Sequence, residues 1–161
     1  RVQAAHEGAE SVPGSVTSPG IGIELPFEQD VTAFVGEAYA HRTFFTRLHQ
    51  FVLTSDAFVV APGGIGTVLE LMMIWKLAQV GHLENTPLIL GGDMWPGLVE
   101  WAKVTMLSTN PPLANPKDLD LPRCVTGADE AIALIRKHYS VWKKKQGHSD
   151  AKAKRGRGKR N

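Results

Sequence analysis

The chain has 161 residues, 43% of them hydrophobic, with one cysteine and a net charge of +2. This length predicts one globular domain with its own core, and a single cysteine excludes an internal disulfide, so we expect a cytoplasmic protein. No apolar run approaches the roughly 18 residues needed to cross a bilayer, and residues 1–6 lack the apolar core of a signal peptide, so we expect no membrane partner.

The charge is distributed unevenly along the chain. Residues 143–161 hold nine lysines and arginines against one acidic residue, for +8, whereas residues 1–142 carry −6. Charge alone therefore does not support the folded body, residues 1–142, as a nucleic-acid-binding surface. Residues 146–161 contain no large apolar side chain, so we expect a basic, disordered tail that is either solvated or binds nucleic acid electrostatically. The folded domain is then residues 1–145.

Hydropathy patterns in the first third of the chain predict two helices and two strands. Phe45, Leu48, Val52 and Leu53 recur at the spacing of one helical face. In chain order we expect the end of a helix at 1–12, a half-buried strand at 15–25, a loop followed by a strand at 31–44, and a helix beginning near Phe45.

From residue 57 onward, strands and helices alternate. Residues 57–61 are a continuous apolar run, which is typical of a strand covered on both faces in a parallel sheet. Residues 68–80 are apolar almost all round, which predicts a helix that is buried or lies at a subunit interface. The remaining expected elements are a strand at 87–90, a helix at 95–107, a loop at 109–122, a strand at 124–125 and a helix at 128–144. This alternation indicates an α/β fold with a parallel sheet.

The apolar strand at 57–61 runs into a glycine-rich loop, Pro62-Gly63-Gly64-Ile65-Gly66-Thr67, which opens a helix. Glycine permits positive φ and close backbone approach, so free N–H groups can converge on an anion. The helix dipole and the Thr67 hydroxyl add to this attraction. The loop lacks the lysine of a triphosphate-binding P-loop and the final glycine of the dinucleotide fingerprint, so it favours a monophosphate. A glycine-rich turn without a ligand is the alternative.

Two charged residues near this loop are candidates for chemistry. Glu70 is the only ionisable residue between Asp56 and Lys76. It either complements the helix dipole or stabilises a developing cation and orients a water. Arg47 precedes the strand that feeds the loop, and it is either a solvated residue of an amphipathic helix or a substrate partner.

The segment from Pro62 to Glu70 resembles the PGGxGTxxE motif of the Lonely Guy family of nucleoside 5′-monophosphate phosphoribohydrolases, for which "lysine decarboxylase-like" is an older label. The resemblance covers about residues 2–140. Flanking matches are Leu25–Gln29 to an LPxEQ segment, Phe44–Arg47 with Asp56–Phe58 to an FFxRK…DAF segment, and Gln79-Val80-Gly81 with Pro87–Leu90 to the stretch after the motif helix.

The resemblance implies a Rossmann-like, doubly wound parallel sheet in three αβα layers, a homodimer, and hydrolysis of a cytokinin-type or AMP-type nucleotide to free base and ribose 5-phosphate. It implies that Arg47 and Glu70 are catalytic and that Gly63, Gly64, Ile65, Gly66 and Thr67 bind phosphate and substrate. It requires no cofactor or metal. A lysine decarboxylase would need a pyridoxal-phosphate lysine, which nothing near the loop supplies.

The sequence also departs from the family pattern. Leu48 replaces the second basic residue of the family's RK pair. The chain begins where a GGGPGxMEA segment would be ending, with Gln3 in place of its glutamate, so we expect an N-terminally truncated fold. That departure leaves a second interpretation open, a non-catalytic carrier protein that binds a nucleotide or the molybdenum cofactor and resembles the molybdenum-cofactor carriers of the same superfamily.

Other residues favour structural roles. The six histidines and Cys124 show no metal-ligand spacing, so no metal site is expected. Trp75, Trp95 and Trp101 fall on apolar helix positions and predict core or interface packing. Asp93 follows a strand end, where parallel sheets bind ligands, but it fits a turn residue better.

Overall fold

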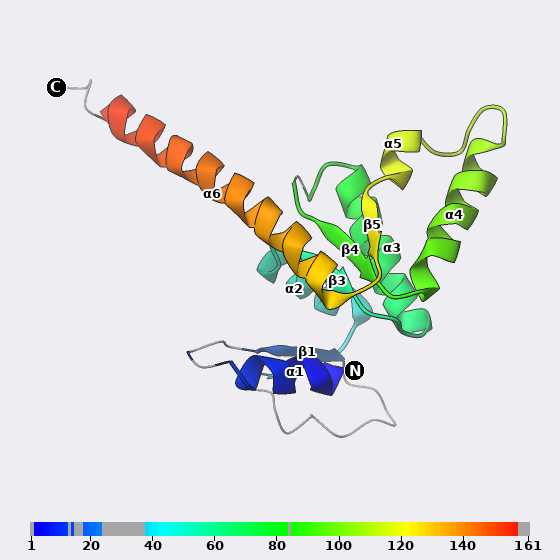
Figure 1. Ribbon diagram of the computed structural model, residues 1–161, viewed down its shortest axis with the longest axis horizontal. Coiled ribbons are helices and arrows are strands. Elements are labelled where there is room, and N and C mark those ends of the chain that lie inside the picture. The colour runs from blue at the N-terminus through cyan, green and yellow to red at the C-terminus, as the bar shows by residue number, and fades with distance from the viewer. Residues whose placement is uncertain (1, 13, 15–17, 24–37, 84, 158–161) are drawn as a thin grey trace. The chain divides into compact units, whose positions relative to one another are not determined.

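The computed structural model describes residues 2–12, 14, 18–23, 38–83 and 85–157, and its fold is α/β with parallel strands, as predicted. The chain divides into two compact units, residues 1–55 and 56–161. Figure 1 labels the elements, which are α1 (Val2–Glu10), β1 (Gly20–Ile23), β2 (Ala38–His41), α2 (Phe44–Thr54), β3 (Phe58–Val60), α3 (Ile65–Gln79), β4 (Leu88–Gly91), α4 (Met94–Leu107), α5 (Pro116–Leu119), β5 (Pro122–Val125) and α6 (Ala128–Arg157).

The first unit contains a two-stranded parallel sheet with one helix against it. β1 pairs with β2 from Gly20 opposite Ala38 onward, and α2 lies against both strands. Thr43 caps α2, since its side-chain oxygen accepts a hydrogen bond from the Thr46 N–H at 3.2 Å. On the predicted apolar face of α2, Leu48 is buried, whereas Phe45 is exposed. The expected strand residues 15–17, 24–25 and 31–37 lie outside the described part of the chain.

The second unit is built on a three-stranded parallel sheet in the order β3-β4-β5. The central strand carries three apolar residues, Leu88, Ile89 and Leu90, that are at most 2% exposed, as expected for a strand covered on both faces. β3 pairs with β4 alone among the described residues, and its middle residue, Val59, is 53% exposed. Among the described residues, the other edge of β3 therefore has no partner strand.

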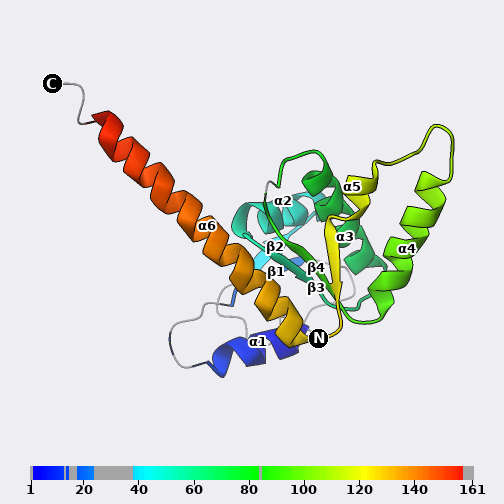
Figure 2. The same cartoon turned by 45° about the horizontal axis from the view of Figure 1, so that its top comes forward.

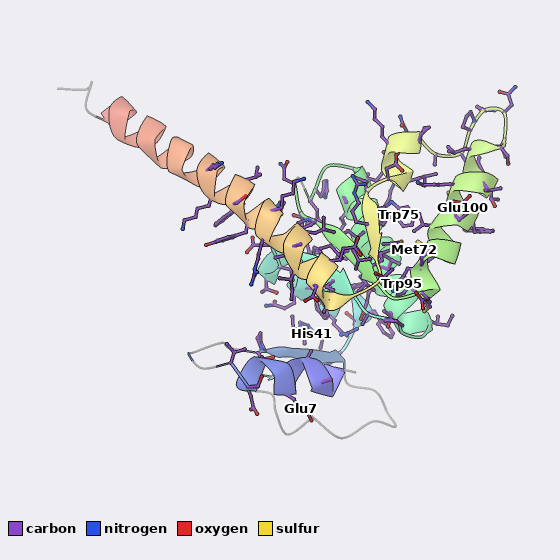
Figure 3. The ribbon with its side chains drawn as sticks, viewed as in Figure 1. Glu7, His41, Met72, Trp75, Trp95 and Glu100 are labelled. Carbon is purple, nitrogen blue, oxygen red and sulfur yellow. The ribbon has the colours of Figure 1, made fainter. Side chains whose placement is uncertain are left out.

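Helices cover both faces of this sheet, as Figure 2 shows for α6 on one side and α3 with α4 on the other. Ile89 and Val125 pack on one face against Ala131, Leu134 and Ile135 of α6. The other helices supply the buried rings of Trp75 and Trp95, which are 7% and 0% exposed and are labelled in Figure 3. Trp101 is 54% exposed within this chain, so only two of these three tryptophans lie in its core.

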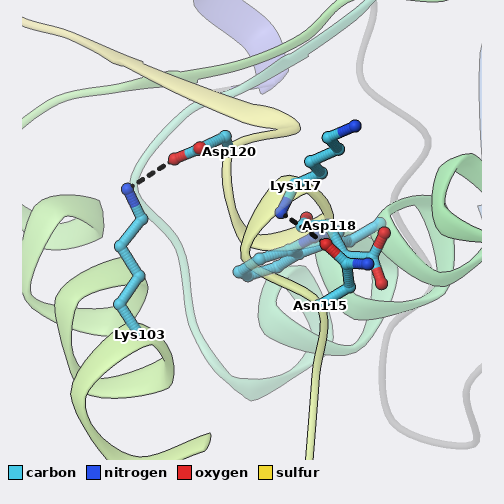
Figure 4. Close-up of polar contacts among 6 residues, drawn as sticks. Lys103, Asn115, Lys117, Asp118 and Asp120 are labelled. Carbon is cyan, nitrogen blue, oxygen red and sulfur yellow. Dashed lines mark hydrogen bonds and ion pairs between the residues drawn. The ribbon is translucent and has the colours of Figure 1, made fainter. Parts of the chain in front are cut away.

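A one-turn helix, α5, lies inside the segment 109–122 that was predicted to be a loop. Asn115 caps it by accepting a hydrogen bond from the Lys117 N–H at 3.0 Å, and a proline occupies its first turn (Figure 4). The Trp75 Nε1–H donates to the Asp118 carbonyl at 2.7 Å, which fastens α5 to α3. On the surface beside it, Lys103 Nζ lies 2.7 Å from Asp120 Oδ1.

The last helix continues well past its expected end. α6 runs through Arg157, whereas we expected disorder from residue 146. The physical reason is that alanine, lysine, arginine and glutamine are strong helix formers, and a helix that is already nucleated by packing extends at little cost. No helix among the described residues is long and apolar enough to cross a membrane.

Candidate functional site

The glycine-rich loop joins the end of β3 to the start of α3 within the second unit. Gly64 is the N-cap of α3, in an extended conformation with φ −86° and ψ −163°, and no side chain caps the helix. The first helical hydrogen bond runs from the Val68 N–H to the Gly64 carbonyl at 3.1 Å. The preceding N–H groups of the first turn have no acceptor within the helix, so this end of α3 presents donors and the positive end of its dipole.

The three loop glycines do different things. None of the three has positive φ, which occurs among the described glycines only at Gly14, Gly81 and Gly92. A Cβ on Gly63 would lie 2.7 Å from the Thr67 Cβ, so glycine is needed there for close approach. A Cβ on Gly64 or Gly66 would meet nothing within 4 Å. Space therefore remains open over the first turn of α3.

Glu70 lies one turn beyond these donors. It follows Thr67 by three residues and Gly66 by four, so all three share one face of α3. Its side chain is half-buried, and it stands in a helix whose neighbouring positions are apolar, including buried Leu71 and Ile74. The structure thus places a carboxylate and an uncapped helix start on the same face of one helix.

Within the second unit, the residue that follows β4 contacts this loop. Gly92, just after β4, has φ +104° and packs against Pro62, while its N–H donates to the Val125 carbonyl at 3.0 Å. Ligands of open α/β sheets bind beyond the carboxyl ends of the strands. Gly92 was not singled out from the sequence, although a Gly-Gly pair at a strand end was the available signal. Asp93 is exposed at the N-cap position of α4 and makes no side-chain cap bond.

Arg47 belongs to the first unit, whereas the loop and Glu70 belong to the second. Its Nε–H donates to the Ile21 carbonyl of β1 at 2.9 Å, and its guanidinium lies 5.1 Å from the centre of the Phe51 ring. Both contacts hold the head of the side chain, which is half-buried. The alternative of an arginine that is simply solvated on a helix surface does not describe this residue.

The histidines and Cys124 were considered as metal ligands. Within the described ranges, no three His, Cys, Asp or Glu side chains lie together in a way that could hold a metal ion. Partial burial raises the pKa of the Cys124 thiol above its ordinary value, which disfavours the reactive thiolate. The LPxEQ-like segment at 25–29 lies outside the described residues.

Comparison with known proteins identifies the family of this chain. The model of a family described as "Possible lysine decarboxylase" matches residues 2–135. A rice protein (Oryza sativa subsp. japonica) named "Probable cytokinin riboside 5'-monophosphate phosphoribohydrolase LOG4" is 34% identical over 82 residues, which are 51% of this chain and 33% of that protein. The Arabidopsis thaliana proteins named cytokinin riboside 5'-monophosphate phosphoribohydrolase LOG3 and LOG4 are each 33% identical over 91 residues, 56% of this chain and 40% of theirs.

Proposed function

Since the chain belongs to the possible lysine decarboxylase family, and its named relatives are phosphoribohydrolases, we propose that it hydrolyses the N-glycosidic bond of a nucleoside 5′-monophosphate. The observation that carries this proposal is the shared face of α3, where uncapped N–H donors, open space over Gly64 and Gly66, and the Glu70 carboxylate follow one another within about one turn. Cytokinin riboside monophosphates and AMP are the substrate classes to test first.

In this proposal the phosphate lies over the first turn of α3. Backbone N–H groups and the Thr67 hydroxyl donate to its oxygens, and the helix dipole favours its charge. The open space at Gly64 and Gly66 lets the phosphate come close to the backbone. No triphosphate-binding lysine follows the loop, which suits the smaller charge of a monophosphate.

Glu70 then acts at the sugar. As the bond between C1′ and the base nitrogen breaks, its electron pair leaves with the base, and the ribose becomes oxocarbenium-like. A carboxylate beside that centre stabilises the positive charge and orients a water, whose oxygen bonds to C1′. Of the two protons of that water, one stays on the new hydroxyl and the other ends on the departing base, which gives free base and ribose 5-phosphate.

Arg47 is the proposed second substrate residue. The bond from Nε to the Ile21 carbonyl and the Phe51 ring restrict its guanidinium to one orientation. A guanidinium held in this way can bind an anionic or carbonyl oxygen with two parallel hydrogen bonds. We assign it to positioning the nucleotide.

The test is turnover of AMP and of a cytokinin riboside monophosphate, with free base measured by chromatography. Glu70→Gln should lower kcat about a hundredfold or more, because it keeps the shape of the side chain but removes its charge. Glu100→Gln, a change at an exposed position of α4, is the matched control and should leave turnover unchanged. Equal activity of Glu70→Gln and the parent protein would refute the role, and nucleotide binding without turnover by the parent protein would refute the hydrolase in favour of a carrier.

We also propose a homodimer. Exposed apolar side chains on α4 support it, since Met94, Trp101 and Val104 are 44%, 54% and 61% exposed in this chain. Residues 94 and 101 are two turns apart on one side of the helix. Stable interfaces between subunits bury large apolar side chains of this kind.

A further inference from the structure

The C-terminal half of α6 is a long basic helix that the proposed reaction does not use. From residue 143 to residue 157 the helix carries seven lysines and arginines against one acidic residue, Asp150. The packing of α6 on the sheet comes from its other end, through Ala131, Leu134 and Ile135. Figures 1 and 2 both show the rest of the helix running clear of the strands of its unit. At a helical rise of 1.5 Å, residues 143–157 span about 22 Å.

An exposed aromatic pair lies directly before this basic stretch. Tyr139 and Trp142 stack on each other with ring centroids 5.8 Å apart and an angle of 21° between the rings. They remain 54% and 40% exposed, and they are not members of the apolar cluster that holds α6 on the sheet. Trp142 directly precedes three consecutive lysines. A partner of this surface should therefore both stack on aromatic rings and carry negative charge.

Single-stranded nucleic acid has the chemistry that fits. Its phosphates pair with lysine and arginine, and its unpaired bases stack on exposed aromatic rings. A membrane surface fits less well, because an interfacial helix needs an apolar face, and residues 146–157 offer no apolar side chain larger than alanine. We propose that Tyr139, Trp142 and the basic helix of residues 143–157 form a binding surface for single-stranded nucleic acid. This surface is separate from the nucleotide site on α3.

The test uses the full chain and a fluorescent 20-nucleotide oligouridylate, with binding followed by anisotropy at several salt concentrations. We expect binding that weakens as salt rises, with log K falling by about 0.7 per phosphate neutralised for each unit of log salt. Lys143→Gln combined with Lys145→Gln should make this slope shallower by about 1.4. Trp142→Ala should weaken binding about fivefold to a hundredfold and leave the slope unchanged, because stacking does not depend on counterions.

Phe45→Ala is the matched control, because it removes an exposed aromatic side chain of α2 that belongs to neither proposed surface, and it should leave binding unchanged. Far-UV circular dichroism of each variant checks that the helices are retained. Three results would overturn the proposal: no binding of the oligonucleotide at low salt, equal affinity for a 20-base-pair duplex with no effect of Trp142→Ala, or binding of anionic lipid vesicles in place of the oligonucleotide.

Discussion

Gly92 lies so close to Pro62 that a Cβ on the glycine would come within 2.8 Å of the proline Cγ. The two residues belong to the loops that follow neighbouring strands, β4 and β3. Gly92 also has φ +104°. Glycine is therefore favoured at this position both by the backbone conformation and by the close contact with Pro62. The glycine-rich loop of the candidate site therefore takes part of its shape from a residue thirty positions away in sequence.

Gly92→Ala is expected to lower the free energy of unfolding by about 1–3 kcal/mol, since the new side chain strains the backbone and collides with Pro62. Gly97→Ala is the control, because a Cβ at that position of α4 meets nothing within 4 Å and its helix should gain stability. Urea denaturation measures both. Equal effects of the two substitutions would contradict the contact.

The loop glycines should separate stability from ligand binding. Gly66→Ala is expected to leave the fold intact and raise the KM for the nucleotide about tenfold or more, because its Cβ enters the open space where we place the phosphate. Gly63→Ala should instead lower the melting temperature, since its Cβ collides with Thr67. A Gly66→Ala protein with unchanged KM would place the phosphate elsewhere.

Trp75→Phe is expected to lower the free energy of unfolding by about 1–2 kcal/mol through loss of the hydrogen bond to the Asp118 carbonyl, in addition to the loss of ring volume. Trp95→Phe is the comparison, because its buried Nε1 has no hydrogen-bond partner among the described residues. Hydrogen exchange distinguishes the two variants: amides of α5 should exchange faster in Trp75→Phe only. Unchanged exchange in α5 would contradict the role of this bond.

The pH dependence of one surface pair follows from its hydrogen bond. Lys103 lowers the pKa of the Asp120 carboxyl, and the same bond raises the pKa of Lys103. A depressed carboxyl pKa gives stability that is present above the ordinary Asp pKa and is lost as pH falls through the folded value. By NMR titration, Lys103→Gln should return the Asp120 pKa toward its ordinary value, and Lys117→Gln should not. Because both groups are exposed, added salt should weaken the shift.

Trp101→Glu should convert the proposed dimer into monomers, because it places a charge in an apolar interface. Sedimentation velocity measures the change, and Val12→Glu, at another exposed apolar position, is the control. A parent protein that sediments as a monomer at high concentration would contradict the dimer.

Local patterns predicted most of the fold. The apolar runs of β3 and β4 and the turn residues that end them placed the parallel sheet, because a strand covered on both faces leaves few choices of residue. The helix was predicted to start at residue 68, but α3 starts at Ile65. Ile65 is 87% exposed, so it does not contribute to the buried face on which the prediction was based. The one turn of α5 is too short for periodicity, although Asn115-Pro116 is a helix-start signal.

The local structure around the candidate site could be predicted only in part from sequence. The strand–loop–helix arrangement around Gly63–Thr67 followed from sequence, but the need for glycine at Gly63 and Gly92 arises from contacts with Thr67 and Pro62. The anchoring of Arg47 joins α2 to the carbonyl of Ile21, twenty-six residues earlier. Contacts between elements leave no periodic trace in sequence, so only the structure reveals them.

The edge of β3 that faces away from β4, which has no partner strand among the described residues, has a consequence for how this protein associates. Successive residues of a parallel strand direct their backbone groups to opposite sides, and Phe58 donates to the Pro87 carbonyl beside β4 at 2.9 Å. The N–H and C=O of Val59 therefore face away from β4, next to a side chain that is 53% exposed. Such an edge is a template on which another extended chain can continue the sheet through main-chain bonds, whatever its sequence. We therefore expect association through this edge to depend on protein concentration and on net charge, which is only +2 at neutral pH.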